Sequence, residues 1–384
     1  MSSIFFAVLL VLFTRSMQLG TYEHIITSTL SVYTGFIQLH GIGYWDERSL
    51  ENSMLLTDSL TGQISRLQHV TAVVPRIETF ALASSGENTT GVTVTGIDPQ
   101  KEDRMSKLSE KLVKGHYIHS GCTGILVAKG LSENLRLSPG DSVVLLSQGY
   151  HGTNAAGLYY VNGIVDLPVP DLNQSMVYMS LDAAQYFLSM YSRVTSVAVM
   201  IDDPDHLSSV EKKLKDSLGM KYEIMNWREM VPELVQSIEI DNAGGIIMLG
   251  ILYVVIGFGI FGTVMMMTEE RKREFAILLA VGMKKLRIQL MIILETMIIG
   301  LVGVVCGILF SIPLLFYMKA HPIHLSGTAA EAMLKYGFEP LIPFLVDVSL
   351  FLKQLIAVLV IAAIAVIYPL WTISRLKISK TLHA

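Results

Sequence analysis

Few residues of this chain have the types and the spacing that chemistry requires. The run from Gly257 to Gly262 matches the dinucleotide-binding pattern G-x-G-x-x-G, but it lies inside an uncharged apolar stretch. That pattern functions between a strand and a solvated helix N-terminus, so we interpret the match as accidental. His321 and His324 have the spacing of two metal ligands, with no nearby cysteine and no carboxylate cluster beside them.

Sequence patterns for nucleotide binding and for nucleophilic catalysis are absent. No G-x-x-x-x-G-K-[ST] loop occurs, and no Ser/His/Asp or Cys/His set lies at a useful spacing. We therefore expect no catalytic residue, no metal site and no cofactor in this chain.

The glycines of the apolar stretches have a different explanation, which is helix packing. Gly303 and Gly307 are one helical turn apart, so they lie on one face and allow another helix to approach closely. The same role is expected for Gly257 and Gly262.

The composition favours a membrane protein. Of 384 residues, 51% are hydrophobic and 16% are charged, and the mean hydropathy is +0.50. Soluble domains carry about 25% charged residues. The formal net charge of −4 argues against a nucleic-acid-binding protein, and two cysteines exclude a disulfide scaffold.

Four stretches are expected to cross the membrane, because a bilayer core needs about 20 apolar helical residues. Three of them are long, and the first is abbreviated because Arg15 ends its uncharged run. The expected spans are residues 1–20, 243–268, 288–318 and 350–371.

The basic residues predict the orientation. Residues 269–287 contain six Lys/Arg, and the tail 372–384 is also basic. The positive-inside rule places both segments in the cytoplasm. Residues 21–242 and the loop 319–349 are then extracytoplasmic. The expected fold is an integral membrane α-helical protein with four transmembrane helices and a large α+β extracytoplasmic domain between the first and second.

Within the extracytoplasmic domain, alternating and helical patterns predict mixed secondary structure. The expected strands are 76–85, 90–98, 142–147, 158–166, 175–181 and 194–202, and the expected helices are 53–68, 126–137, 182–190, 205–218 and 228–240.

Glu295 is the acidic residue inside a predicted span. An intramembrane carboxylate is costly and is a functional candidate for that reason. It lies only seven residues after Ile288, however, so a second interpretation is a carboxylate near the headgroups bonded to a neighbouring helix or to Arg287. The sequence leaves both interpretations open.

The cytoplasmic segment 269–287 carries the strongest local pattern. Charged residues at 269–274 and 284–287 bracket an apolar run, 275–283, that is too short to span a bilayer. This pattern is typical of a short amphipathic helix at the membrane surface, with an apolar side available to a partner groove. The alternative is a plain interfacial connector.

Residues 270–295 resemble the signature of the MacB/FtsX superfamily of ABC-transporter permeases, in which this segment forms the helix that couples to a separate ATPase. Leu279 stands where the family often has a basic residue, and Glu295 matches a common family glutamate. The positions that match the coupling signature are Glu270, Arg271, Arg273, Glu274, Ile277, Leu278, Ala280 and Gly282.

Further segments resemble the lipoprotein-releasing permeases LolC and LolE and the MacB-type periplasmic core domain. They are residues 91–99, 114–118, 125–146 and 158–187 of the extracytoplasmic domain. The end of the chain from Tyr368 resembles the closing pattern of the MacB/FtsX superfamily, with Leu370 and Ile373 departing from it.

The resemblance implies a permease subunit of the mechanotransmission type in the bacterial inner membrane, with its large domain in the periplasm. It would couple an ABC ATPase, which binds ATP and Mg²⁺, to release or export of lipoprotein or other amphiphilic cargo from the outer leaflet. Further implied partners are a second permease copy or paralogue and a periplasmic carrier or adaptor. The alternatives are an FtsX-like regulatory permease that moves no cargo and a MacB-type peptide or drug exporter.

Overall fold

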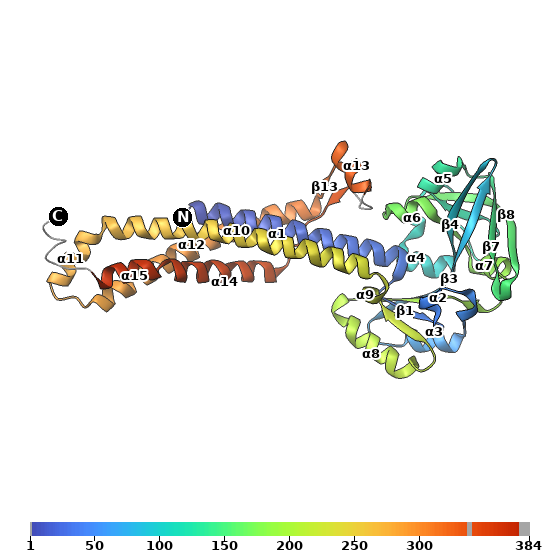
Figure 1. Ribbon diagram of the computed structural model, residues 1–384, viewed down its shortest axis with the longest axis horizontal. Helices are drawn as coiled ribbons and strands as arrows, with labels where there is room; N and C mark the ends of the chain where they lie inside the picture. The colour runs from blue at the N-terminus through green and yellow to red at the C-terminus, as the bar shows by residue number, and fades with distance from the viewer. Residues whose placement is uncertain (1, 336–339, 376–384) are drawn as a thin grey trace. The chain divides into compact units, whose positions relative to one another are not determined.

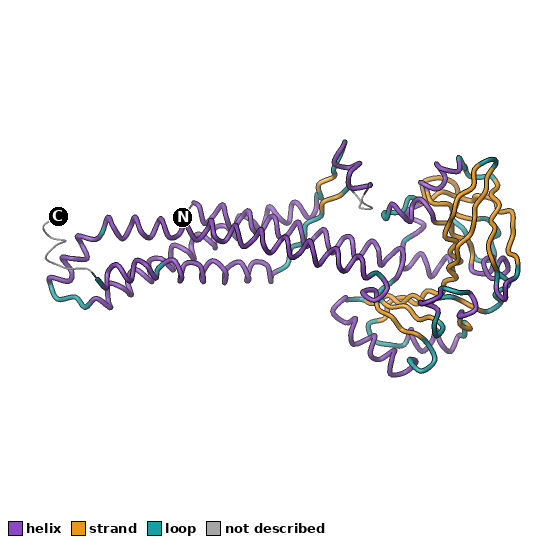
Figure 2. The backbone as a smooth tube through the Cα atoms, in the orientation of Figure 1, coloured by secondary structure: helices purple, strands orange, loops and turns teal. Residues whose placement is uncertain are grey.

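The computed structural model of the protein describes residues 2–335 and 340–375. The chain divides into two compact units. The helical unit comprises Met1–His24, Gln236–Leu325 and Leu341–Ala384, and the sheet unit comprises Ile25–Val235 and Ser326–Pro340. Figure 2 shows the strands concentrated in the sheet unit and long helices in the other.

The described residues contain four helical segments that are long and apolar enough to cross a membrane, as the sequence predicted. Figure 1 labels the helices that form them. They are α1 (Ser2–Thr29), α10 (Pro232–Glu270), α12 (Lys285–Ala320) and the pair α14 (Val348–Ala365) and α15 (Ile367–Ser374).

The last segment is divided at Val366, between α14 and α15. Pro369 accounts for the division. A proline within a helix cannot donate a backbone hydrogen bond, and its ring crowds the carbonyl four residues earlier, which here belongs to Ala365.

The first helix corrects a sequence-based expectation. We expected it to end near Gly20, but α1 continues to Thr29 and then as a π-helical turn, Leu30–Thr34. No proline or glycine interrupts residues 21–34, and the chain turns only at Gly35, which has a φ of 67°. Within α1, Arg15 donates to Gln18 Oε1 at 2.7 Å, so its charge has a partner one turn away.

The sheet unit contains a ten-stranded sheet in the order β12-β1-β11-β3-β4-β9-β6-β8-β5, with β7 paired to β3 and β8. Most pairs are antiparallel, while β4 with β9 and β6 with β8 are parallel. The strands are β1 (Ile37–His40), β3 (Val70–Ser85), β4 (Asn88–Ile97), β5 (Leu112–Gly115), β6 (Ile125–Ala128), β7 (Ser142–Gln148), β8 (Asn154–Val165), β9 (Met176–Ser180), β11 (Ser196–Ile201) and β12 (Glu223–Asn226).

The hairpin between β3 and β4 connects the predicted strands 76–85 and 90–98. Ser85 pairs with Asn88, and the two residues between them include Gly86 with a φ of 59°. Two-residue hairpin turns favour glycine because they require positive φ.

Short helices accompany the sheet, and two-stranded pairs form outside it. The helices are α2 (Tyr44–Glu47), α3 (Asp58–Ser65), α4 (Pro99–Ser106), α5 (Lys129–Leu135), α6 (Pro170–Ser175), α7 (Leu181–Phe187), α8 (Leu207–Leu218), α9 (Trp227–Met230) and α13 (Thr328–Lys335), and the paired strands are β2 (Met54–Leu55) with β10 (Arg193–Val194) and β13 (Ile323–His324) with β14 (Leu341–Ile342).

Three predicted helices of this domain were wrong in extent. The stretch 126–137 begins as the fully buried strand β6, because its apolar run pairs with both β8 and β9. In 53–68 only Asp58–Ser65 is helical. In 228–240 the chain breaks after Met230, and α10 starts at Pro232, where the missing N–H of proline costs nothing.

The strands that adjoin α1 and α10 in sequence are neighbours in the sheet. β1 is the first strand after α1, and β12 is the last strand before α10. They pair antiparallel, with Ile37 opposite Asn226. The chain therefore enters and leaves the sheet through two hydrogen-bonded strands.

Candidate functional site

The segment between α10 and α12 folds into a short helix with a defined start and end. α11 (Lys272–Ala280) is separated from α10 by Arg271, whose backbone leaves the helical conformation at φ −95° and ψ 6°. The helix therefore begins after a kink at Arg271.

The end of α11 is a Schellman motif. Met283 donates its backbone N–H to the carbonyl of Leu278 at 3.0 Å, and Gly282 donates to that of Leu279 at 3.1 Å. Gly282 has a φ of 102°, a conformation that strongly favours glycine. The sequence itself indicates such an end, because Gly282 stands near the end of the apolar run 275–283 and a helix C-terminus favours a residue that tolerates positive φ.

Arg271 connects three elements of this segment. Its Nη1 donates to both carboxylate oxygens of Glu295 on α12, at 3.0 and 2.8 Å. Its Nε donates to Glu274 on α11 at 3.2 Å, and its guanidinium lies 5.5 Å from the ring centre of Phe275. Phe275 itself is 1% exposed. Arg271 therefore joins the start of α11 to the early turns of α12.

This pairing identifies the partner of Glu295. The sequence offered Arg287 or a neighbouring helix as partners, and the structure places Arg271 there, at the start of the neighbouring helix α11. The Arg271 and Glu295 side chains are 34% and 33% exposed, so the pair is partly shielded from solvent. A carboxylate in a predicted span is thereby neutralised by an ion pair.

The residues matched to the coupling signature lie mainly on the exposed side of α11 and its flanks. Arg271 and Leu278 are half-buried, whereas Glu270, Arg273, Glu274, Ile277, Ala280 and Gly282 are exposed. Phe275 and Ala276 form the buried side. The exposed side also presents Val281, Met283 and Leu286, so apolar and charged groups share it.

Comparison with known families decides the classification. Residues 1–217 match the MacB-like periplasmic core domain, and residues 246–378 match the FtsX-like permease C-terminal domain. The chain belongs to the MacB/FtsX superfamily of ABC-transporter permeases. Both matched domains are permease domains rather than ATPase domains.

Relatives of this MacB/FtsX permease include lipoprotein-releasing proteins. It is 22% identical over 323 residues to the lipoprotein-releasing system transmembrane protein LolC of Xylella fastidiosa, covering 82% of this chain and 78% of the relative. It is 21% identical over 272 residues to LolE of Haemophilus influenzae, covering 68% and 65%. The periplasmic region of MacB from Actinobacillus actinomycetemcomitans is a similar solved structure, with 18% identity, a TM-score of 0.37 and coverage of 54% and 95%.

In this MacB/FtsX permease the predicted packing glycines differ in their surroundings. A Cβ on Gly303 would lie 2.9 Å from Ile4 Cγ2, and one on Gly307 would lie 2.8 Å from Val8 Cγ1. α1 and α12 thus contact each other within one chain. A Cβ on Gly257 would lie 3.5 Å from Ile361, which is an ordinary contact.

Gly262 has no such neighbour among the described residues of this chain. An added Cβ there would meet no described atom within 4 Å. The packing role expected at Gly262 therefore stays a prediction, because no described element of this chain covers that face of α10.

Several contacts around the site escaped sequence reasoning. Lys285 donates to the carbonyl of Ser374 at 2.8 Å, and Gln289 donates to that of Leu370 at 3.3 Å, which joins α12 to α15. The ion pair of Arg271 with Glu295 was also missed. Its one available signal was a lone acidic residue within a helical span near a basic segment.

Proposed function

We propose that this ABC-transporter permease subunit works by mechanotransmission: it couples a separate ATPase to the release or export of lipoprotein or another amphiphilic cargo. The observation that carries the proposal is the architecture of α11. The helix is capped at one end by a Schellman motif and held at the other by Arg271. Its exposed side combines apolar and charged residues, a combination suited to a partner's groove.

The ion pair of Arg271 with Glu295 supports a route for motion within the helical unit. A displacement of α11 by an ATPase would be carried directly to α12, because the two carboxylate contacts join the helices. A flexible connector without such contacts would absorb the displacement.

The sheet unit has features that suit it to receive motion. β1 and β12, the strands next to α1 and α10 in sequence, are paired. The backbone carbonyls of Val32 and Tyr33, just after α1, accept hydrogen bonds from Arg76 in the centre of the sheet. A shift of the chain at either strand would therefore be shared by both.

An apolar surface on the sheet supports an amphiphilic cargo or an apolar partner. Leu82 pairs with Leu146, and Val144 pairs with Leu158, on three adjacent strands. Exposed apolar side chains gathered on a sheet face are typical of binding surfaces. The exposed residues of this surface are Phe80, Leu82, Val144, Leu146, Leu158 and Tyr160.

We infer a location in the bacterial inner membrane, with the sheet unit in the periplasm and α11 in the cytoplasm. The basic residues of 269–287 support this orientation. In a chain lacking Cys122 and Cys306, cysteines at Gln63 or Ala329 should react with an impermeant thiol reagent in spheroplasts, whereas one at Lys272 should not. Labelling of the cysteine at position 272 would show that the orientation is the opposite of the one proposed.

The coupling proposal is tested by the double variant Gly282→Leu/Glu274→Arg. Leucine at a φ of 102° should unwind the end of α11, and arginine at position 274 should repel Arg271. The variant should insert normally but lose its co-purifying ATPase, or leave ATP turnover unresponsive to the permease.

A matched control is Gly86→Leu/Glu87→Arg at the tip of the β3–β4 hairpin. Gly86 also has positive φ, and an added Cβ there meets nothing within 4 Å, as at Gly282. This control should retain the ATPase. If the α11 double variant also retained it and supported normal transport, the segment would be only a connector.

A further inference from the structure

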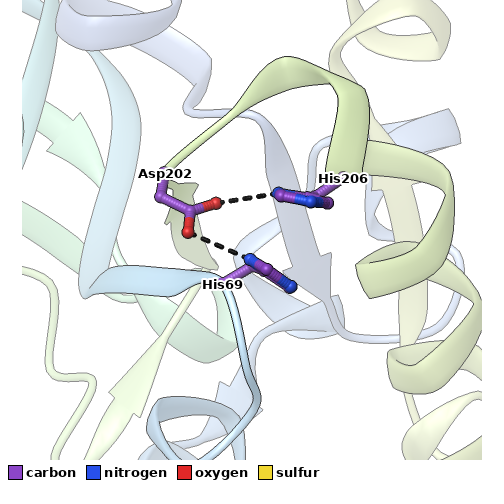
Figure 3. Close-up of side chains that lie close together, drawn as sticks. All are labelled: His69, Asp202 and His206. Atoms are coloured by element: carbon purple, nitrogen blue, oxygen red, sulfur yellow. Dashed lines mark hydrogen bonds and ion pairs between the residues drawn. The ribbon is translucent and has the colours of Figure 1, made fainter.

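Three polar side chains converge beside the ends of two neighbouring strands of the sheet unit, far from α11 in the sequence. Figure 3 shows His69, Asp202 and His206 pointing toward one another. His69 directly precedes β3, Asp202 directly follows β11, and His206 directly precedes α8. β3 and β11 are paired here, with Val70 opposite Ile201, which brings distant segments together.

The geometry of the group is close. His69 Nδ1 lies 3.0 Å from Asp202 Oδ2, and His206 Nδ1 lies 3.1 Å from Asp202 Oδ1. The two imidazole rings stack with their centres 3.6 Å apart. One potential ligand atom from each residue lies within 4.8 Å of the others. All three side chains retain solvent access, at 23%, 47% and 39% exposure for His69, Asp202 and His206.

The backbone holds His69 in an unusual conformation. Its φ is 75°, in the left-handed region that non-glycine residues seldom occupy. Its carbonyl accepts a hydrogen bond from the backbone N–H of Asp202 at 3.0 Å, which fixes the two residues together. Such conformations tend to persist where the surrounding structure has a use for the side chain they position.

From this geometry we propose that His69, Asp202 and His206 bind a divalent transition-metal ion of the Zn²⁺ type. Two imidazole nitrogens and one carboxylate oxygen suit Zn²⁺, Co²⁺ or Ni²⁺, whereas Ca²⁺ and Mg²⁺ prefer oxygen ligands alone. The sequence predicted no metal site, and this assignment replaces that expectation.

The spacing of the ligand atoms suits such an ion after a small rearrangement. Metal–ligand bonds of about 2.0–2.2 Å in a tetrahedron place the ligand atoms roughly 3.3–3.5 Å apart. The observed N···O separations of 3.0 and 3.1 Å lie just below this range, but they run to different oxygens of Asp202, so one of the two imidazoles must move toward the oxygen that the other contacts. The stacked rings must rotate about χ2 so that both Nδ1 lone pairs converge, and their partial exposure leaves room for it. The metal then takes the place of the two hydrogen bonds to Asp202.

The bound ion would join the start of β3, the end of β11 and the start of α8. Because a ligand that binds only the folded state stabilises it, metal should raise the unfolding temperature of the full chain. Three protein ligands leave one tetrahedral position open to water or another donor. The proposal does not depend on the transport function.

The test uses the full chain in detergent, with any polyhistidine tag removed and EDTA dialysed away. It is titrated with Co²⁺, followed by visible d–d absorption, and with Zn²⁺, followed by calorimetry and thermal unfolding. The wild type should bind the ion and unfold at a higher temperature in its presence. His206→Gln and His69→Asn should each weaken binding by about tenfold or more, since each removes a ligand. Asparagine is chosen at position 69 because it tolerates positive φ.

The matched control is His151→Gln. His151 Nδ1 lies 2.9 Å from Glu51, but this exposed pair has no third potential ligand among the described residues. The control should bind metal as the wild type does. Binding lost equally in His151→Gln, unchanged in both site variants, or absent from the wild type would overturn the proposal. If His69→Asn failed to fold, as judged by circular dichroism, His206→Gln would decide the question alone.

Discussion

Arg271 and Glu295 are 24 residues apart in sequence, and one guanidinium nitrogen of the first contacts both carboxylate oxygens of the second. Arg271 lies at the kink between α10 and α11, and Glu295 lies on α12. One ion pair therefore joins three consecutive helical elements. Without the other, either charged side chain would be energetically costly beside apolar helices.

Removing either charge of this pair should lower the stability of the helical unit and weaken the coupling of α11 to α12. Glu295→Gln leaves the Arg271 guanidinium partly shielded without its main partner. We expect a loss of about 1–3 kcal/mol in stability, between the values for surface and buried pairs. Stimulation of the ATPase by the permease should fall more than stability does, as measured by ATP turnover in proteoliposomes.

Lys272→Gln is the control for this prediction. It removes a surface ion pair with Glu269, one turn away and about as close at 3.0 Å, without touching α12. It should leave turnover near the wild-type value. Equal effects of Lys272→Gln and Glu295→Gln on turnover would show that the connection to α12 has no special role.

Gly307→Leu should disrupt the contact between α1 and α12. Even the first added carbon would lie 2.8 Å from Val8, so the two helices must separate. Overpacking of this kind costs about 1–3 kcal/mol, visible as a lower unfolding temperature in detergent. The effect belongs to the folding of one chain, because the contact is internal.

Gly262→Leu supplies the comparison. It introduces the same side chain into another apolar helix at a position that meets no described atom within 4 Å. Its unfolding temperature should stay close to that of the wild type. A larger loss for Gly262→Leu than for Gly307→Leu would contradict the observed packing.

Arg76→Met should destabilise the sheet unit strongly. Arg76 and Glu102 are 1% and 0% exposed, and two nitrogens of the guanidinium contact the carboxylate at 2.8 and 2.6 Å. Leaving Glu102 buried without its partner should cost about 3–5 kcal/mol. The double variant Arg76→Met/Glu102→Leu should recover part of this loss in thermal unfolding. If the double variant recovered no stability, the main contribution of Arg76 would be its hydrogen bonds to the carbonyls of Val32 and Tyr33.

His40 should make stability depend on pH. Burial lowers the pKa of His40 from 6.5 to about 4, opposed by its contact with the Thr195 carbonyl. Between these values the unfolded chain binds a proton that the folded chain does not, so stability is lost as pH falls from 6.5 to 4. The loss is about 3 kcal/mol at most. His40→Phe should flatten this part of the profile of unfolding temperature against pH.

The sequence by itself determined the number of long apolar helices, the basic segment between two of them and the glycine at its helix end, although it placed the end of the first helix too early. These features follow from local rules: apolar length, charge distribution and the conformation that glycine tolerates. Six of the ten strands of the main sheet were also predicted, whereas β1, β5, β6 and β12 were not. The ends of helices were predicted less well. An apolar run such as Ile125–Ala128 fits a buried strand or a helix equally well, and only its neighbours in the fold decide between them.

Tertiary structure alone decided which distant groups meet. The partner of Glu295, the contact of Gly307 with Val8 and the absence of any described contact at Gly262 depend on how helices are arranged, which periodicity does not specify. His69 lies 133 residues from Asp202, and only the pairing of β3 with β11 brings them together. Spacing along a chain carries information over a few helical turns; across a sheet, register determines which side chains become neighbours.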